Sequence, residues 1–127
     1  MDTQELNTCS LEQIEARRVG NYWLYNTNTD GELIVRYVGR SDKCLLKRLR
    51  QHIGYGKYEF FSYQYSPTYP LVRTAFDIEC REFHLFKDQL DNKIHPDAPR
   101  HLPYKCKYCE LNKAITDGNV NTGVESQ

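Results

Sequence analysis

The sequence predicts an α+β domain in which a small three-stranded antiparallel sheet is flanked by helices. Two segments rich in Tyr, Trp, Val and Ile, 21–26 and 33–39, are joined by Asp30-Gly31, a strong signal for a hairpin turn. A third segment, 58–65, alternates aromatic and polar residues, as a half-buried strand does. Apolar residues repeat at helical spacing between and after these strands, which adds helices to the sheet.

The first helix is predicted from a capping box. Residues 10–13 read Ser-Leu-Glu-Gln, in which the first and last side chains can satisfy free N–H groups at a helix start. A short helix is therefore expected over 11–18, after a loose leader at 1–9.

The helix after the hairpin is predicted over 43–53. Ser41 or Asp42 can cap its start, and Gly54 is placed to end it. Its buried face is expected to consist of four aliphatic side chains, Leu45, Leu46, Leu49 and Ile53.

We expect one domain over residues 1–93, with its core at about 19–93, because 127 residues suffice for one modest core. A segment containing Pro, His and Cys, 94–115, is expected to pack on this domain or extend it. Residues 116–127 offer little to bury, which predicts a disordered tail.

The composition points to a cytoplasmic protein without a membrane span. Residues 1–20 carry acids and arginines and no apolar run, so no export signal is expected. No stretch is long and apolar enough to cross a bilayer. The five cysteines are accordingly expected to be reduced thiols or metal ligands.

Positive charge is concentrated in one region although the formal net charge is zero. Between residues 36 and 58, seven Lys and Arg side chains accompany one Asp. Such a patch can bind phosphates, but an ordinary solvated helix face would have the same composition. The substrate-binding candidates are Gly39, Arg40, Lys43 and Asn92.

Two tyrosine motifs, Gly20-Asn21-Tyr22 and Tyr37-Val38-Gly39, fall in the first two predicted strands. A two-residue turn would pair Tyr22 with Gly39 and place both tyrosines on one sheet face as diagonal neighbours. Two phenols would then converge over a glycine, leaving space for a ligand. Alternatively, they are plain strand aromatics.

Arg48 and His52 lie along one edge of the buried face of helix 43–53, four residues apart. This edge is expected to face the tyrosines, whereas Lys47 points to solvent. A guanidinium presents a planar fork of donors that suits a phosphate. A surface arginine and a boundary histidine are the alternative interpretations.

The longest predicted helix begins near Pro67 or Pro70 and runs to about Phe86. Glu79 interrupts an apolar seam of this helix, whose other members are Val72, Phe76, Phe83 and Phe86. A buried carboxylate needs a cation, a metal or hydrogen-bond donors. A salt bridge to a nearby Arg is the alternative to a metal, and Glu82 is expected to be solvated.

Together these residues resemble the GIY-YIG nuclease family over about residues 19–93. The resemblance depends on the order of six elements: Gly20-x-Tyr22, Tyr37-Val38-Gly39, Arg48, His52, Glu79 and Asn92. The sequence departs from the pattern at Asn21, where an apolar residue is usual.

The resemblance implies an enzyme that hydrolyses DNA with one Mg²⁺ or Mn²⁺ ion. Glu79 would be the metal ligand, and Tyr22 the general base or the group that positions the attacking water. Arg48 would stabilise charge on the phosphate, while Tyr37 and His52 would orient water, Tyr22 or the leaving group. Asn92 would hold the substrate backbone or the local structure.

A possible zinc site follows the resembling region. Cys106 and Cys109 are spaced as half of such a site, and His95 and His101 lie close enough in sequence to complete it. Two free thiols are the alternative.

A small metal-dependent endonuclease acting on DNA is the favoured hypothesis. A catalytically inactive nucleic-acid-binding or protein-interaction module is the rival, and a zinc-stapled structural protein is a third possibility. RNA as the substrate, the type of DNA recognised and the oligomeric state all stay open.

Overall fold

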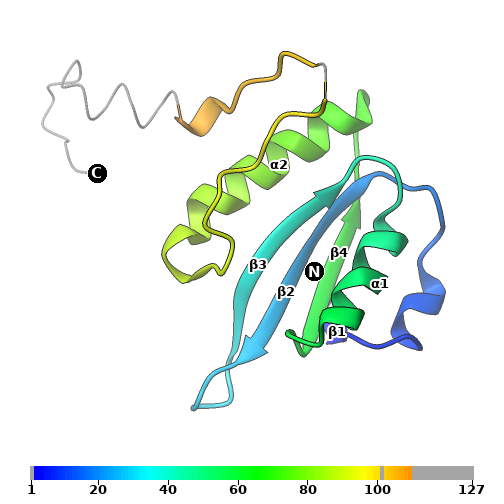
Figure 1. Cartoon of the computed structure of the whole chain (residues 1–127), viewed down its shortest axis with the longest axis vertical. Coiled ribbons are helices and arrows are strands. Elements are labelled where there is room, and N and C mark those ends of the chain that lie inside the picture. Colours follow the sequence, from blue (N-terminus) through cyan, green and yellow to red (C-terminus); the bar gives the residue numbers. More distant parts are fainter. Residues whose placement is uncertain (1, 101, 110–127) are drawn as a thin grey trace, which may run out of the picture.

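A four-stranded antiparallel sheet is the centre of the fold (Figure 1). The computed structural model describes residues 2–100 and 102–109, which form an α+β structure. The strands are β1 (Gln4–Glu5), β2 (Gly20–Thr27), β3 (Leu33–Ser41) and β4 (Phe60–Tyr65), in the spatial order β1-β4-β2-β3. The three predicted strands are present. The two-residue β1 was missed because so short a strand shows no alternating pattern.

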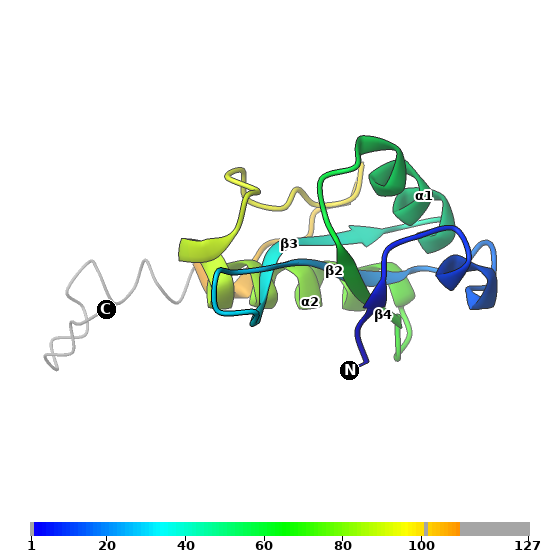
Figure 2. The same ribbon diagram turned by 90° about the horizontal axis from the view of Figure 1, so that it is seen from below.

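Two α-helices cover opposite faces of the sheet. Figure 2 shows α1 (Leu45–Tyr55) on one side and α2 (Leu71–Phe86) on the other. A 3₁₀ turn, η1 (Ser10–Gln13), lies between β1 and β2, and another, η2 (Lys87–Gln89), extends α2. Within the described residues, none of the helices combines the length and apolar character that crossing a membrane requires.

Tyr22 pairs with Gly39 in the β2–β3 hairpin, as predicted, but the loop and the strand register next to it differ from the prediction. The two-residue turn is wrong, because the strands are joined by a five-residue loop, 28–32. The side-chain oxygen of Asn28 accepts hydrogen bonds from two backbone N–H groups of this loop, at 2.9 and 3.0 Å. A β-bulge that leaves Arg36 without a strand partner then restores the register expected at Tyr22.

The predicted helix over 11–18 is wrong beyond its first turn. The chain forms only η1, becomes extended at Ile14 and adopts a positive φ of 63° at Arg17. Leu11 and Ile14 are the buried side chains here, and one tight turn places residues three apart on the same side.

Helix α1 begins and ends two residues later than predicted. Gly54 lies inside it, and Gly56 ends it with a left-handed φ of 67°. At the other end, the Ser41 hydroxyl accepts a hydrogen bond from the Cys44 N–H at 2.9 Å. The predicted cap at Ser41 or Asp42 is wrong, because Cys44 occupies the cap position; Ser41 instead stabilises the turn that leads into the helix.

Alternation along the strands divides the core into two layers. Tyr22 and Leu24 of β2 pack with the leucines of α1, whereas Trp23 between them packs with Phe83 of α2. The expectation that Glu82 is solvated is wrong, because its Oε1 accepts a hydrogen bond from Trp23 Nε1 at 3.0 Å. Both faces of β2 are therefore buried, and β3 lies at the edge of the sheet.

The loop that follows α2 covers the outer edge of β3. Three donors of this loop bond to backbone carbonyls of residues 35, 36 and 38: Gln89 Nε2 at 3.1 Å, the Asp91 N–H at 2.6 Å and Asn92 Nδ2 at 2.9 Å. The Asp91 carboxylate adds a salt bridge to Arg36 at 2.9 Å.

After this loop the chain doubles back along α2 (Figure 1). Cys106 is buried there beside Phe76 and Cys80. This part of the 94–115 segment therefore packs on the domain. His101 and the predicted tail at 116–127 lie outside the described residues.

Candidate functional site

Tyr22, Tyr37 and His52 form one aromatic cluster between the sheet and α1. The Tyr22 hydroxyl and His52 Nε2 are 3.0 Å apart and share a hydrogen bond. The two phenol rings are stacked with centroids 6.1 Å apart, and the His52 ring lies 5.0 Å from that of Tyr37. The structure thus brings together three of the residues that the sequence singled out.

The space above Gly39 is filled by the Tyr22 ring. A Cβ atom at position 39 would overlap the Tyr22 ring and its hydroxyl. The expectation of open space for a ligand at this point is therefore wrong. Gly39 is required by the close approach of Tyr22, which places the phenol in the middle of the cluster.

The cluster is uncharged near neutral pH. Burial is the main cause that raises the pKa of Tyr22, which has no exposed surface, and the pKa of the partly exposed Tyr37. Burial and the neighbouring Arg48 lower the pKa of His52 to about 4. Neither phenol is poised to act as a base by itself in this state, and the imidazole is neutral.

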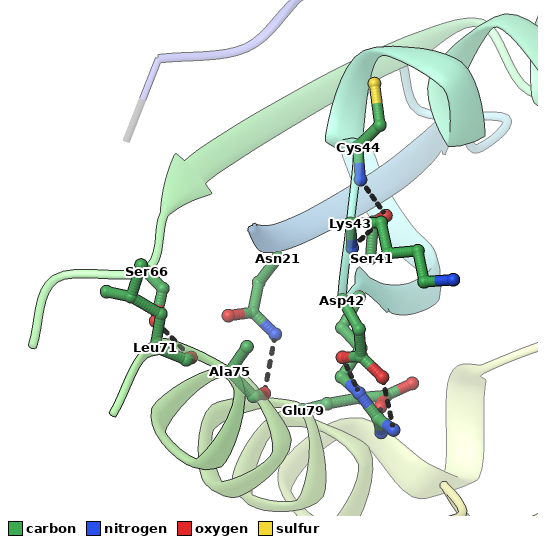
Figure 3. Close-up of polar contacts among 10 residues, drawn as sticks. Asn21, Ser41, Asp42, Lys43, Cys44, Ser66, Leu71, Ala75 and Glu79 are labelled. Carbon is green, nitrogen blue, oxygen red and sulfur yellow. Dashed lines mark hydrogen bonds and ion pairs between the residues drawn. The ribbon is translucent and has the colours of Figure 1, made fainter. Parts of the chain in front are cut away.

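Glu79 and Asp42 converge on the guanidinium of Arg40 (Figure 3). Arg40 Nη1 lies 2.6 Å from Glu79 Oε1, and Arg40 Nε lies 2.8 Å from Asp42 Oδ1. The salt bridge considered for Glu79 is therefore present. Burial nevertheless raises the pKa of Glu79, with Arg40 acting in the opposite direction. Burial also opposes the charge on Arg40, but Asp42 and Glu79 outweigh it and raise its pKa.

An open cleft of about 620 Å³ lies next to this ion-pair network, at the C-terminal end of β3. The cleft is lined by charged side chains of both signs: Arg40, Lys43, Lys47 and Arg48, with Asp42, Glu79 and Asp97. Arg48 comes from α1 and Glu79 from α2. Both side chains can line one cleft because β3 is an edge strand, so residues from the two faces of the sheet can approach each other around it.

The cleft and the aromatic cluster share one electrostatic environment. The charge of Glu79 contributes to raising the pKa of both Tyr22 and Tyr37, while Arg48 acts to lower both values. Such mutual influence requires the acid, the guanidinium and the phenols to be near one another. A change of charge at Glu79 would therefore change the pKa of both tyrosines.

Two asparagines have structural roles. Asn92 Nδ2 donates to the Val38 carbonyl at 2.9 Å, which fits the local-structure alternative for this residue. Asn21, at the position where the resembling family has an apolar residue, is buried and donates to the Ala75 carbonyl at 3.0 Å (Figure 3). Asn21 thereby joins β2 to the helix that carries Glu79.

Sequence reasoning missed two cleft carboxylates and one member of the metal cluster. Asp42 was considered only as a helix cap, and Asp97 has no local pattern that marks it. His84 lies beside His95, Cys106 and Cys109, and the four ligand atoms are all within 4.8 Å of one another. Among the described residues, His84 thus joins three members of the predicted zinc set, whereas His101 lies outside the described residues.

Comparison of the chain with models of protein families, with curated proteins and with solved structures found no match.

Proposed function

We propose that this chain is a metal-dependent endonuclease that hydrolyses DNA phosphodiester bonds in the cleft at the C-terminal end of β3. The observation that carries the proposal is that Arg48 and Glu79, from helices on opposite faces of the sheet, line the same open cleft. A guanidinium and a carboxylate near two phenols and an imidazole form the set expected from the resemblance to GIY-YIG nucleases.

Cations at the cleft would hold the nucleic-acid backbone. Lys43 and Lys47 are exposed, and Arg48 lies beside them at the same rim. Phosphate contacts of this kind position a duplex without reading its sequence. The formal net charge of zero leaves this local patch as the main attraction for DNA, so binding is expected to weaken steeply with salt.

The donors of the cleft fit a hard divalent cation. Three carboxylates line it, and oxygen ligands of this kind are preferred by Mg²⁺ and Mn²⁺. Glu79 would hold the ion, with Asp42 beside it, and Arg40 would compete with the ion for both. When bound, such an ion neutralises charge that develops on the phosphate.

Residues of the chain would contribute position and charge to the hydrolysis. A water oxygen attacks phosphorus and gives up a proton to the solvent, the P–O bond to the leaving oxygen breaks, and that oxygen takes up a proton from the solvent. Arg48 would donate hydrogen bonds to the non-bridging phosphate oxygens as their charge rises. Tyr37, which is partly exposed, would orient the water, and the buried Tyr22 and neutral His52 would hold Tyr37 in place.

Plasmid nicking tests the proposal with two glutamates of the same helix. With Mg²⁺ or Mn²⁺ the wild type should nick supercoiled DNA, and Glu79→Gln should lower the rate by about 10²-fold or more. Glu82→Gln keeps an acceptor for Trp23 and lies outside the cleft lining, so it should nick like the wild type. Unchanged nicking by Glu79→Gln would reject the proposal.

A non-cleaving module that binds nucleic acid is the second candidate. The ion pair between Arg40 and Glu79 favours it, because the pair explains the buried carboxylate without any metal. DNA and RNA gel shifts distinguish the two. Retarded bands without cleavage in either metal, weakened by Arg48→Ala but not by Arg50→Ala on the exposed face, would support the module.

A further inference from the structure

We propose that His84, His95, Cys106 and Cys109 form a structural zinc site that fastens the C-terminal segment to α2. Their four ligand atoms lie within 4.8 Å of one another, although the residues come from separate parts of the chain. The site is separate from the cleft, and the inference does not depend on the proposed nuclease activity.

The sulfur–nitrogen distances match those in a tetrahedral site. With Zn–S bonds of ~2.3 Å and Zn–N bonds of ~2.05 Å, tetrahedral angles place a ligand sulfur about 3.6 Å from a ligand nitrogen. His84 Nε2 lies 3.5 Å from Cys106 Sγ and 3.4 Å from Cys109 Sγ. His95 Nε2 lies 3.2 Å from Cys109 Sγ. The four side chains therefore need only small shifts to hold one ion.

The surroundings of His95 prepare its ring for a metal. Its Nδ1 is 2.7 Å from the Pro96 carbonyl oxygen, so the proton lies on Nδ1 and is donated to that oxygen. The lone pair is then on Nε2, the nitrogen that faces the sulfurs. Such a hydrogen bond on the far side of the ring is the usual support of a zinc-bound histidine.

Zinc fits this cluster better than a dithiol redox pair. Two imidazoles and two thiols are a frequent tetrahedral set for Zn²⁺, whereas a redox pair has no need of two converging histidines. Cys80 lies next to Cys106 but is not a ligand.

The ion would join segments that share little core. His84 belongs to α2, His95 follows the loop that covers β3, and Cys106 and Cys109 lie near the end of the described chain. Asp97 lies between these anchor points and lines the cleft. Metal binding would thus hold one wall of the cleft against the helix that carries Glu79, and its free energy would add to folding.

Metal analysis of the purified full-length chain tests the site. The wild type should retain about one zinc per chain after a chelator wash, and His84→Ala should retain less than about a tenth of that. His84→Cys supplies another ligand atom and should restore zinc. Cys9→Ser is the matched control and should retain it, since the exposed Cys9 lies outside the cluster. His101→Ala removes the other histidine considered from the sequence and should also retain zinc if His84 is the ligand.

Cobalt absorption keeps the test independent of folding defects. Co²⁺ added to the zinc-free wild type should give the visible bands of a tetrahedral site and a thiolate charge-transfer band. Cys109→Ser, at an exposed position, should lower the charge-transfer intensity by about half, because the Cys106 thiolate remains. The proposal is overturned if wild-type chain takes up neither metal, or if the tetrahedral bands persist in His84→Ala and disappear in His101→Ala.

Discussion

Acidification from pH 7.5 to 5 should destabilise the protein through His52. The pKa of this histidine is about 4 in the folded chain and about 6.5 without its surroundings. Its side chain is buried, Nε2 is bonded to Tyr22, and among the described residues Nδ1 has no acceptor for a second proton. The folded state therefore favours the neutral ring.

The sign and size follow from proton linkage. Because the unfolded state binds more protons, the contribution is fully present above pH 6.5 and is lost as the pH falls toward 4. The gap between these pKa values corresponds to a limit of about 3 kcal/mol. At pH 5, where the folded ring is still mostly neutral, about 2 kcal/mol of unfolding free energy should be lost.

Urea unfolding at pH 7.5 and 5, followed by Trp23 fluorescence, measures this loss. Trp23 is the only tryptophan in the chain and is buried, so its emission reports unfolding. His52→Gln cannot titrate, so its stability should fall less than that of the wild type over this range. Other groups, including His84, change equally in both proteins. Equal losses in the two proteins would refute this account of His52.

Two further substitutions test the packing of the site. Gly39→Ala forces a methyl group into the Tyr22 ring and should lower the free energy of unfolding by about 1–3 kcal/mol. Gly54→Ala adds a methyl group in open space within α1 and should raise the free energy of unfolding by up to about 1 kcal/mol. Thermal melts of both variants measure these changes. Asp91→Asn weakens the charge-assisted bond from Tyr58 and should cost roughly 1–3 kcal/mol. Burial acts to raise the pKa of Asp91, but hydrogen bonds, that from Tyr58 included, lower it overall. The difference in stability between Asp91→Asn and the wild type should therefore shrink below pH 3.8, where Asp91 becomes protonated.

Most of the fold could be predicted because strand alternation and helical spacing depend only on short stretches of sequence. The three long strands and both α-helices follow from alternation and helical spacing. The hairpin shows the limit of this approach. The turn was predicted too short, yet the bulge at Arg36 offsets that error, so Tyr22 still pairs with Gly39. Bulges depend on neighbouring strands and have no local signal.

The site was harder to predict because its partners are distant in sequence. The carboxylate in an apolar seam marked Glu79, but nothing local indicated that Arg40, rather than a metal, would be its neighbour. For the metal cluster, His101 is closer in sequence to the cysteines than His84 is. Only the return of the chain along α2 brings His84 to them.

The covering of β3 has a consequence for self-association. An unprotected outer strand is a template for intermolecular β-sheet growth and aggregation. Here the side chains of Gln89 and Asn92 and the N–H of Asp91 already occupy carbonyls that a second polypeptide would need. Two copies of this chain could therefore pair along this part of β3 only after that loop had moved away from the strand.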